Sequence, residues 1–267
     1  MLISVEEMKR IPAFVFLLIP FIFFFSSCYL LPVSQIDTTG MSRVRAGAPG
    51  LSHQEYVRRL SADGWPVDSL NTAADADYLD DDEKNLILAH NLVRYNPQKF
   101  AALYVTEYIA YFRGREFLYP GLRTILITRE GARPAAELYR LLKRTEPMQL
   151  LHPSYGLSLS SELYINYLIE NEARGHEGLG GPGIRVSRFG SWKTIIGENI
   201  SYGNFSAHDA LLFLLIDDKV MDRSHRKVIL NPAFRYIGLA KGRHPSFPVG
   251  KSYVINYADF FTEHPEK

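Results

Sequence analysis

The stretch from residue 176 to residue 225 constrains this chain more than any other part of the sequence. It contains His176 and His225, with acidic side chains at Glu198 and at the neighbouring positions Asp217 and Asp218. Two imidazoles and two carboxylates are suited to hold one divalent cation or to polarise one water molecule. These side chains come from a glycine-rich loop, a second loop, the end of an apolar helix and the start of a further segment. A site of this kind forms only if the fold brings separate elements together.

The spacing resembles that of the CAP superfamily, which comprises the cysteine-rich secretory, antigen 5 and pathogenesis-related class 1 proteins, and above all that of its bacterial SCP-like members. In that family a loop histidine, the glutamate of a GEN motif, a second acidic residue and a later histidine line a central cavity. The matching positions here are His176, Glu198, Asp217 or Asp218, and His225. The run HRKVILNPAFRYIGLA that begins at His225 also matches the family pattern.

The resemblance covers roughly residues 79–262 and implies an α+β fold of the CAP type. In this α-β-α sandwich, helices cover both faces of a small antiparallel sheet. Strands are expected at residues 200–202, 236–240 and 253–260. Helices are expected at residues 52–60, 81–95 and 134–144, from Ser160 or Ser161 to about residue 174, and from Ser206 or Asp209 onward.

The residues alone leave two roles open for Glu198, the candidate catalytic residue. Its carboxylate could ligate a metal or take a proton, or it could fix its loop by accepting backbone N–H bonds. Counting along the chain places Asp217 at the family's second acidic position, with Leu214 where many relatives have tryptophan. Aspartate is one methylene shorter than glutamate, and capping of the following segment is an equally good role for it.

Composition excludes some classes of function. The chain has 267 residues, 46% of them hydrophobic and 22% charged, as in an ordinary globular protein. A net charge of +1 gives no reason to expect a nucleic-acid partner. The single cysteine, Cys28, excludes an intrachain disulfide.

The N-terminus has the order of a secretory signal, with Lys9 and Arg10 before an apolar run at residues 11–25 and small residues after it. The run of about 15 residues is short for a bilayer span of roughly 20. Ser26-Ser27-Cys28 resembles a relaxed bacterial lipobox, so Cys28 is the predicted lipidation site. An ordinary signal peptide or a short anchor is the alternative.

The expected organisation is a signal peptide at residues 1–28, a tether with a short helix at 29–78, and a CAP domain at 79–267 with an insertion at about 101–150. The acidic run that ends at Glu83 is expected to begin a helix rather than form a calcium loop. His90 is expected to be packed rather than a ligand. The aromatic residues at 104–112 are expected in the core, with a lipid-sized groove as the alternative.

Three hypotheses for function follow. The first is an exported, lipid-anchored protein of the cell envelope, or an extracellular one, that binds a lipid-like or small-molecule ligand. In that case a divalent cation such as Zn²⁺ is the candidate cofactor. The second is a zinc-dependent hydrolase in which His176 and His225 are ligands and Glu198 activates water, although no HExxH motif is present. The third is a cell-surface interaction protein in which the four side chains form a structural polar core.

Overall fold

The computed structural model describes residues 30–32, 50–119 and 124–265. Cys28 and the predicted signal peptide lie outside the described residues. The helices are α1 (His53–Ala62), α2 (Val67–Leu70), α3 (Asp81–Tyr95), α4 (Pro97–Phe100), the π-helix η2 (Ala101–Val105), α5 (Thr106–Ala110), α6 (Arg133–Leu142), α7 (Tyr155–Glu170), the 3-10 helix η3 (Gly178–Gly180), α8 (Gly181–Val186), α9 (Ala207–Ile216) and α10 (Ser224–Ile229).

Within the residues that the structure describes, the strands form three sheets. A central sheet has the order β5-β8-β9-β7, a small sheet has the order β1-β4-β3-β2, and β10 pairs with β6. The strands are β1 (Leu30–Pro32), β2 (Phe112–Arg113), β3 (Glu116–Leu118), β4 (Thr124–Ile127), β5 (His152–Pro153), β6 (Gly190–Trp192), β7 (Ile196–Asn204), β8 (Tyr236–Gly242), β9 (Lys251–Ala258) and β10 (Phe261–Glu263).

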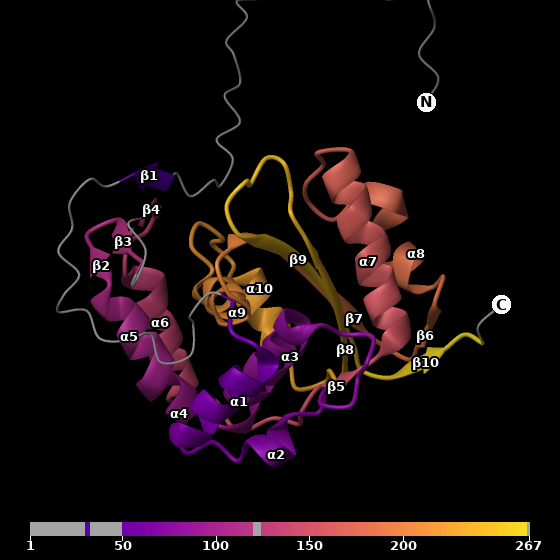
Figure 1. Cartoon of the computed structure of the whole chain (residues 1–267), viewed down its shortest axis with the longest axis horizontal. Helices are drawn as coiled ribbons and strands as arrows, with labels where there is room; N and C mark the ends of the chain where they lie inside the picture. The colour runs from indigo at the N-terminus through magenta and orange to yellow at the C-terminus, as the bar shows by residue number, and fades with distance from the viewer. Residues whose placement is uncertain (1–29, 33–49, 120–123, 266–267) are drawn as a thin grey trace, which may run out of the picture.

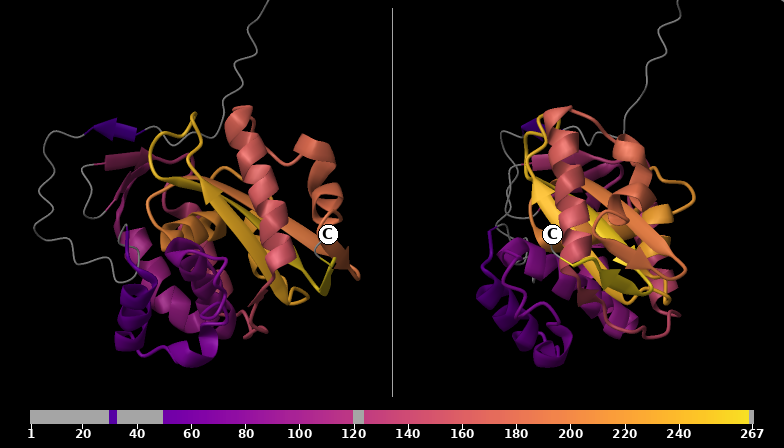
Figure 2. Two further views of the ribbon diagram at one scale, coloured as in Figure 1. Left: turned by 45° about the vertical axis from the view of Figure 1, so that its right-hand side comes forward. Right: turned by 90° about the vertical axis from the view of Figure 1, so that its right-hand side faces the viewer.

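The central sheet is antiparallel through β8, β9 and β7, as expected, and the two-residue β5 adds a parallel pairing beside β8. Helices cover both of its faces. In Figures 1 and 2, α7 and α8 lie on one side of β7, β8 and β9, and α3, α9 and α10 lie on the other. The fold is therefore an α+β sandwich of the α-β-α type.

Alternate residues of the central strands enter different hydrophobic clusters, because successive side chains of a strand point to opposite faces. Ile237 and Leu239 of β8 pack in the large cluster with α3 and α9. Ala240 of β8 and Val254 of β9 pack with Tyr164 of α7 instead. Burial on both faces explains why these strands lack the polar alternation of a half-exposed sheet.

Helix α7 lies very close to β8. A Cβ atom at Gly238 would overlap the backbone of Leu157 and Ser158, so only glycine permits this contact. The helix begins earlier than expected, because Ser154 is its N-cap and accepts a bond from Leu157 N at 3.3 Å. The expectation that Ser160 or Ser161 begins it is wrong. Both serines are buried inside the helix, and Ser161 donates to the Gly238 carbonyl of β8 at 3.2 Å.

Helix α3 occupies the expected residues, Asp81–Tyr95. Asp80 caps its first turn, and Glu83 returns a bond to the Asp80 N–H, which completes a capping box. The acidic run therefore begins a helix, as expected. Asp82 accepts bonds from Lys241 of β8 and Lys251 of β9, so the same run ties this helix to the sheet.

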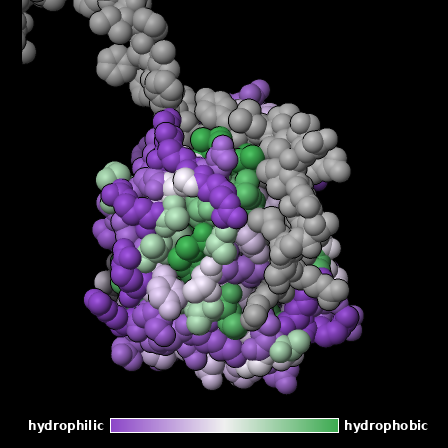
Figure 3. All heavy atoms as spheres, turned by 90° about the vertical axis from the view of Figure 1, so that its left-hand side faces the viewer, coloured by the Kyte–Doolittle hydropathy of each residue, from purple (hydrophilic) through white to green (hydrophobic). Residues whose placement is uncertain are grey.

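Residues 101–150 contain η2, α5, the strands β2, β3 and β4 of the small sheet, and α6, and are called the insertion below. Tyr104, Tyr108 and Tyr111 are buried, so these aromatic side chains belong to the core rather than to a groove. Figure 3 shows the side of the molecule that carries this part, where apolar side chains gather in a patch surrounded by hydrophilic ones.

Residues 50–78 also pack into the large hydrophobic cluster, through Tyr56, Leu60 and Trp65 among others. The compact part of the protein thus includes residues that precede the expected domain start at residue 79. Within the described ranges, no helix has the length and apolar character needed to cross a membrane.

Candidate functional site

The first pair of predicted site residues is His176 and Glu198. His176 lies in the loop after α7, and Glu198 lies in β7. The imidazole Nδ1 is 2.8 Å from Glu198 Oε1. The Glu198 side chain is only 1% exposed, whereas that of His176 is 40% exposed. A buried carboxylate therefore holds a half-exposed imidazole.

Arg185 of α8 is a second partner of Glu198 that the sequence reasoning missed. Its Nη2 lies 2.8 and 2.7 Å from the two carboxylate oxygens. Its Nη1 donates to the carbonyls of His176 and Gly178, and its guanidinium stacks on Tyr164 at 3.4 Å from the ring centroid. Its side chain is fully buried. Three basic residues lie between His176 and Glu198 in the sequence, and spacing alone does not single one out.

The loop that carries His176 is also fixed by tyrosine hydroxyls. Tyr164 donates to the Gly175 carbonyl at 2.6 Å and accepts from Gly178 N at 3.2 Å. Tyr202 accepts from Gly175 N at 3.3 Å. Together with Arg185 these bonds hold the backbone on both sides of His176, so the imidazole is held in a preformed position.

The second pair is Asp217 and His225. His225 Nδ1 is 2.7 Å from Asp217 Oδ1, and the other carboxylate oxygen accepts from Arg226 N at 3.2 Å. Asp217 is the C-cap of α9, with φ 61° and ψ 45° in the left-handed region. Its side chain is 1% exposed and that of His225 is 24% exposed. The arrangement repeats that of His176, with a buried carboxylate beneath a partly exposed imidazole.

Asp218 does not take part in this pair. Its two oxygens accept bonds from the backbone N–H groups of Arg129 and Glu130, both at 2.8 Å. Helical spacing could not decide between the two aspartates, because the helix ends at Ile216 and the chain turns sharply at Asp217. Of the two candidate aspartates, Asp217 is the one that pairs with His225.

The two pairs lie on opposite faces of β7. Glu198 points toward Arg185 on the α8 side. The next residue, Asn199, points the other way and donates to the His225 carbonyl at 3.3 Å and to Tyr257 Oη at 3.4 Å. β7 is an edge strand of the central sheet, which has the order β5-β8-β9-β7.

No metal-binding group of three or more His, Cys, Asp or Glu side chains occurs in the part of the chain that the structure describes. Three protein ligands are typical of catalytic zinc sites. The predicted residues thus do not form one four-residue cluster. They form two separate histidine–carboxylate pairs.

The chemistry of each pair follows from its donor and acceptor. A carboxylate only accepts hydrogen bonds, so Nδ1 of each imidazole carries the proton and Nε2 of the neutral ring keeps a lone pair. A carboxylate behind Nδ1 is also the common partner of histidines that bind metals through the other nitrogen. His176 and His225 can therefore act as ligands or as proton acceptors through Nε2. Glu198 is poorly placed to activate water, because both of its oxygens already accept from Arg185.

Two further histidines are structural. His90 bonds to the Leu86 carbonyl and to Tyr257 Oη, and burial lowers its pKa to about 4. His208 bonds to Tyr56 Oη, and burial lowers its pKa to about 3. Both rings are neutral at physiological pH. The expectation that His90 is a packed residue is confirmed.

Comparisons with known proteins agree with this fold. The model of the CAP family, described as the cysteine-rich secretory protein family, matches residues 89–257, which is more than half of the chain. The chain belongs to this family.

Two solved structures are similar. An outer surface protein of Borrelia burgdorferi is 18% identical, with a TM-score of 0.34, over 46% of this chain and 84% of its own. An extracellular SCP-domain protein of Bacillus anthracis is 21% identical, with a TM-score of 0.31, over 46% of this chain and 37% of its own. No curated protein matches the chain.

Proposed function

We propose that this chain is an exported, lipid-anchored CAP-domain protein of the cell envelope that binds a ligand or a cell-surface partner through His176 and His225. The observation that carries the proposal is the orientation of the two imidazoles. Each is held through Nδ1 by a buried carboxylate, and each keeps Nε2 for an external group. The held backbone on both sides of His176 supports a preformed binding site, because little conformational freedom is lost when a ligand binds.

A divalent cation such as Zn²⁺ is the candidate cofactor. His176, with Glu198 behind it, and His225, with Asp217 behind it, would each offer Nε2 to such a cation, and the carboxylate would orient the ring. The bound cation would supply a positive charge for an oxygen of a lipid-like or small-molecule ligand. One imidazole at each pair leaves the other positions of a four-coordinate zinc ion to water or to that ligand, so binding rather than hydrolysis is the function that this geometry favours.

Calorimetric titration of the purified full chain with Zn²⁺ tests the binding proposal. We expect saturable binding that is lost in the double variant His176→Gln/His225→Gln. The matched control is His264→Gln, since His264 is an exposed histidine of the C-terminal segment that lies outside both pairs. If the double variant binds as well as the control, the imidazoles are not the binding groups and the proposal fails.

Lipid anchoring is proposed for Cys28 from the leader sequence, since stable attachment needs more than one acyl chain and bacterial lipoproteins carry several. Membership of a family described as secretory supports export. Intact-mass measurement of the membrane-extracted protein should show acyl chains on the mature protein, and a Cys28→Ser form should lack them. A free Cys28 thiol on the mature protein would contradict the anchoring.

A further inference from the structure

The loop that connects α9 to α10 has an unusual backbone. Asp217, Lys219 and Arg223 all have positive φ angles, of 61°, 69° and 53°. Residues with a Cβ atom occupy this left-handed region at a cost in free energy, so such a loop keeps its shape only if other parts of the fold hold it. His225 follows this loop directly, and Asp217 begins it. The geometry of the second pair therefore depends on whatever fixes the loop.

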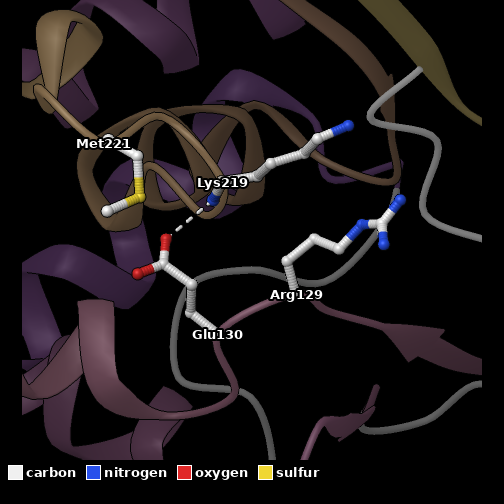
Figure 4. Close-up of a pocket in the computed structure, with 4 residues that line it drawn as sticks. All are labelled: Arg129, Glu130, Lys219 and Met221. Atoms are coloured by element: carbon white, nitrogen blue, oxygen red, sulfur yellow. Dashed lines mark hydrogen bonds between the residues drawn. The ribbon is translucent and has the colours of Figure 1, made fainter. Parts of the chain in front are cut away.

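The insertion supplies the contacts that fix it. Asp218 accepts bonds from the backbone N–H groups of Arg129 and Glu130, as described above. In the other direction, Lys219 N donates to Glu130 Oε1 at 2.9 Å, a bond drawn as the dashed line in Figure 4. A surface cleft of about 400 Å³ lies between the insertion and the loop, and it is lined by Arg129, Glu130, Lys219 and Met221.

Arg223 links the insertion to the Asp217 backbone. Its Nη1 and Nη2 donate to the two oxygens of Glu130 at 2.8 and 2.9 Å, and its Nη2 also donates to Glu137 at 2.9 Å. The same Nη1 lies 2.8 Å from the Asp217 carbonyl. The hydrogen bonds from Arg223 lower the pKa of Glu130 to about 2, so Glu130 is an anion at neutral pH.

A second link reaches the Asp217 carboxylate. Arg226 Nη2 donates to the carbonyl of Pro134, in the first turn of α6, at 3.0 Å. Arg226 also donates through its backbone N–H to Asp217 Oδ2 at 3.2 Å. Its side chain is held further by the Leu215 and Ile216 carbonyls at the end of α9. Residues 129–137 of the insertion thus hold the loop at its start and near its end.

We propose that residues 129–137 are a clamp that fixes the Asp217–His225 pair, with Glu130 as its positioning residue. The Glu130 carboxylate accepts bonds from Arg133, Arg223 and Lys219 N rather than from His225. It acts through Arg223 and the Lys219 backbone. The clamp predicts that the insertion controls one of the two imidazoles and leaves the other, His176, unaffected, since His176 is held by Arg185 and the tyrosines instead.

Imidazole ¹⁵N NMR of the full chain tests this inference, beside the Zn²⁺ titration. The test variants are Glu130→Gln/Glu137→Gln and, separately, Arg223→Lys, which keeps the charge but loses the fork that joins both glutamates to the Asp217 carbonyl. The matched control is Glu146→Gln, an exposed glutamate of the same insertion. His176 serves as an internal reference in every spectrum.

We expect the two test variants to shift His225 from a single tautomer protonated at Nδ1 to a mixture, with His176 and the control unchanged. The Zn²⁺ affinity of the two test variants should fall about tenfold or more, and this expectation rests on the proposed function. His225 signals equal to those of the control would overturn the clamp, as would equal changes at His176 and His225. Absence of Zn²⁺ binding by the parent protein would overturn the proposed function alone, because the tautomer of His225 tests the clamp independently.

Discussion

Arg185 and Glu198 form a buried ion pair, and replacing only one of them is expected to leave the other charge buried without a partner. The double variant should therefore lower the free energy of unfolding by much less than the sum of the two single variants. Arg185→Met leaves the Glu198 carboxylate buried beside His176, and Glu198→Met leaves the guanidinium buried beside two carbonyls. Breaking a buried ion pair in this way costs about 3–5 kcal/mol. In the double variant no uncompensated charge remains.

The magnitude for the double variant follows from the other bonds it loses. Arg185 donates to the His176 and Gly178 carbonyls, and His176 donates to Glu198. Each of these bonds involves a charged group, and at about 1.5 kcal/mol for each the double variant should cost about 4.5 kcal/mol. The two single changes together should cost about 8 kcal/mol, which leaves a coupling energy of about 3.5 kcal/mol.

Equilibrium unfolding in urea, followed by tryptophan fluorescence, measures these free energies in the full chain. Arg188→Met is the matched control, since Arg188 is an exposed arginine close to the same helix and should cost less than about 0.5 kcal/mol. Single variants that cost less than about 1 kcal/mol, or costs that simply add in the double variant, would refute the buried pair as described.

Two further changes probe the fold around the site. Burial raises the pKa of Asp209 from 3.8 to about 6, so its contribution to stability is present below pH 3.8 and is lost as the pH rises through 6. In the parent protein this group should lower the free energy of unfolding by on the order of 3 kcal/mol between about pH 4 and pH 7, and the Asp209→Asn variant should lack this decline. A variant with the same pH dependence as the parent would contradict the assignment. Gly238→Ala should cost about 3 kcal/mol because its Cβ would overlap the α7 backbone. Gly183→Ala is the control, because its Cβ would make only an ordinary contact with Trp192, and it should cost less than about 1 kcal/mol in the same denaturation assay. Equal costs for the two variants would count against the close packing of α7.

Capping residues and helix-stop signals in the sequence predicted those helices whose ends are set by residues next to them in the chain. Asp80, Glu83 and the Asn96-Pro97 step define α3 within one segment, and Ser206 caps α9 in the same local way. The start of α7 was missed because several serines precede or occupy that helix, and Ser154 is the one that caps it, while Ser161 inside the helix bonds to the Gly238 carbonyl of β8. Local capping rules do not contain that tertiary contact.

The candidate site divides in a similar way. The resemblance identified His176, Glu198 and His225, which are motif positions. Counting along the chain placed Asp217 at the second acidic position, but it could not show that this shorter side chain reaches His225, because that contact depends on a left-handed residue after the helix end. It also missed Arg185, whose role comes from the way α8 packs beside β7. The division into two pairs on opposite faces of a strand likewise follows from the three-dimensional fold.

The most direct test of the proposed binding site is the tautomer of His176 and His225 in the parent protein at neutral pH, measured by long-range ¹H–¹⁵N NMR of the imidazoles. The geometry predicts that both rings are protonated at Nδ1, with unprotonated Nε2 atoms that shift when Zn²⁺ is added. Rings protonated at Nε2, without a response to Zn²⁺, would contradict the site, because the nitrogen proposed to bind would already carry a proton.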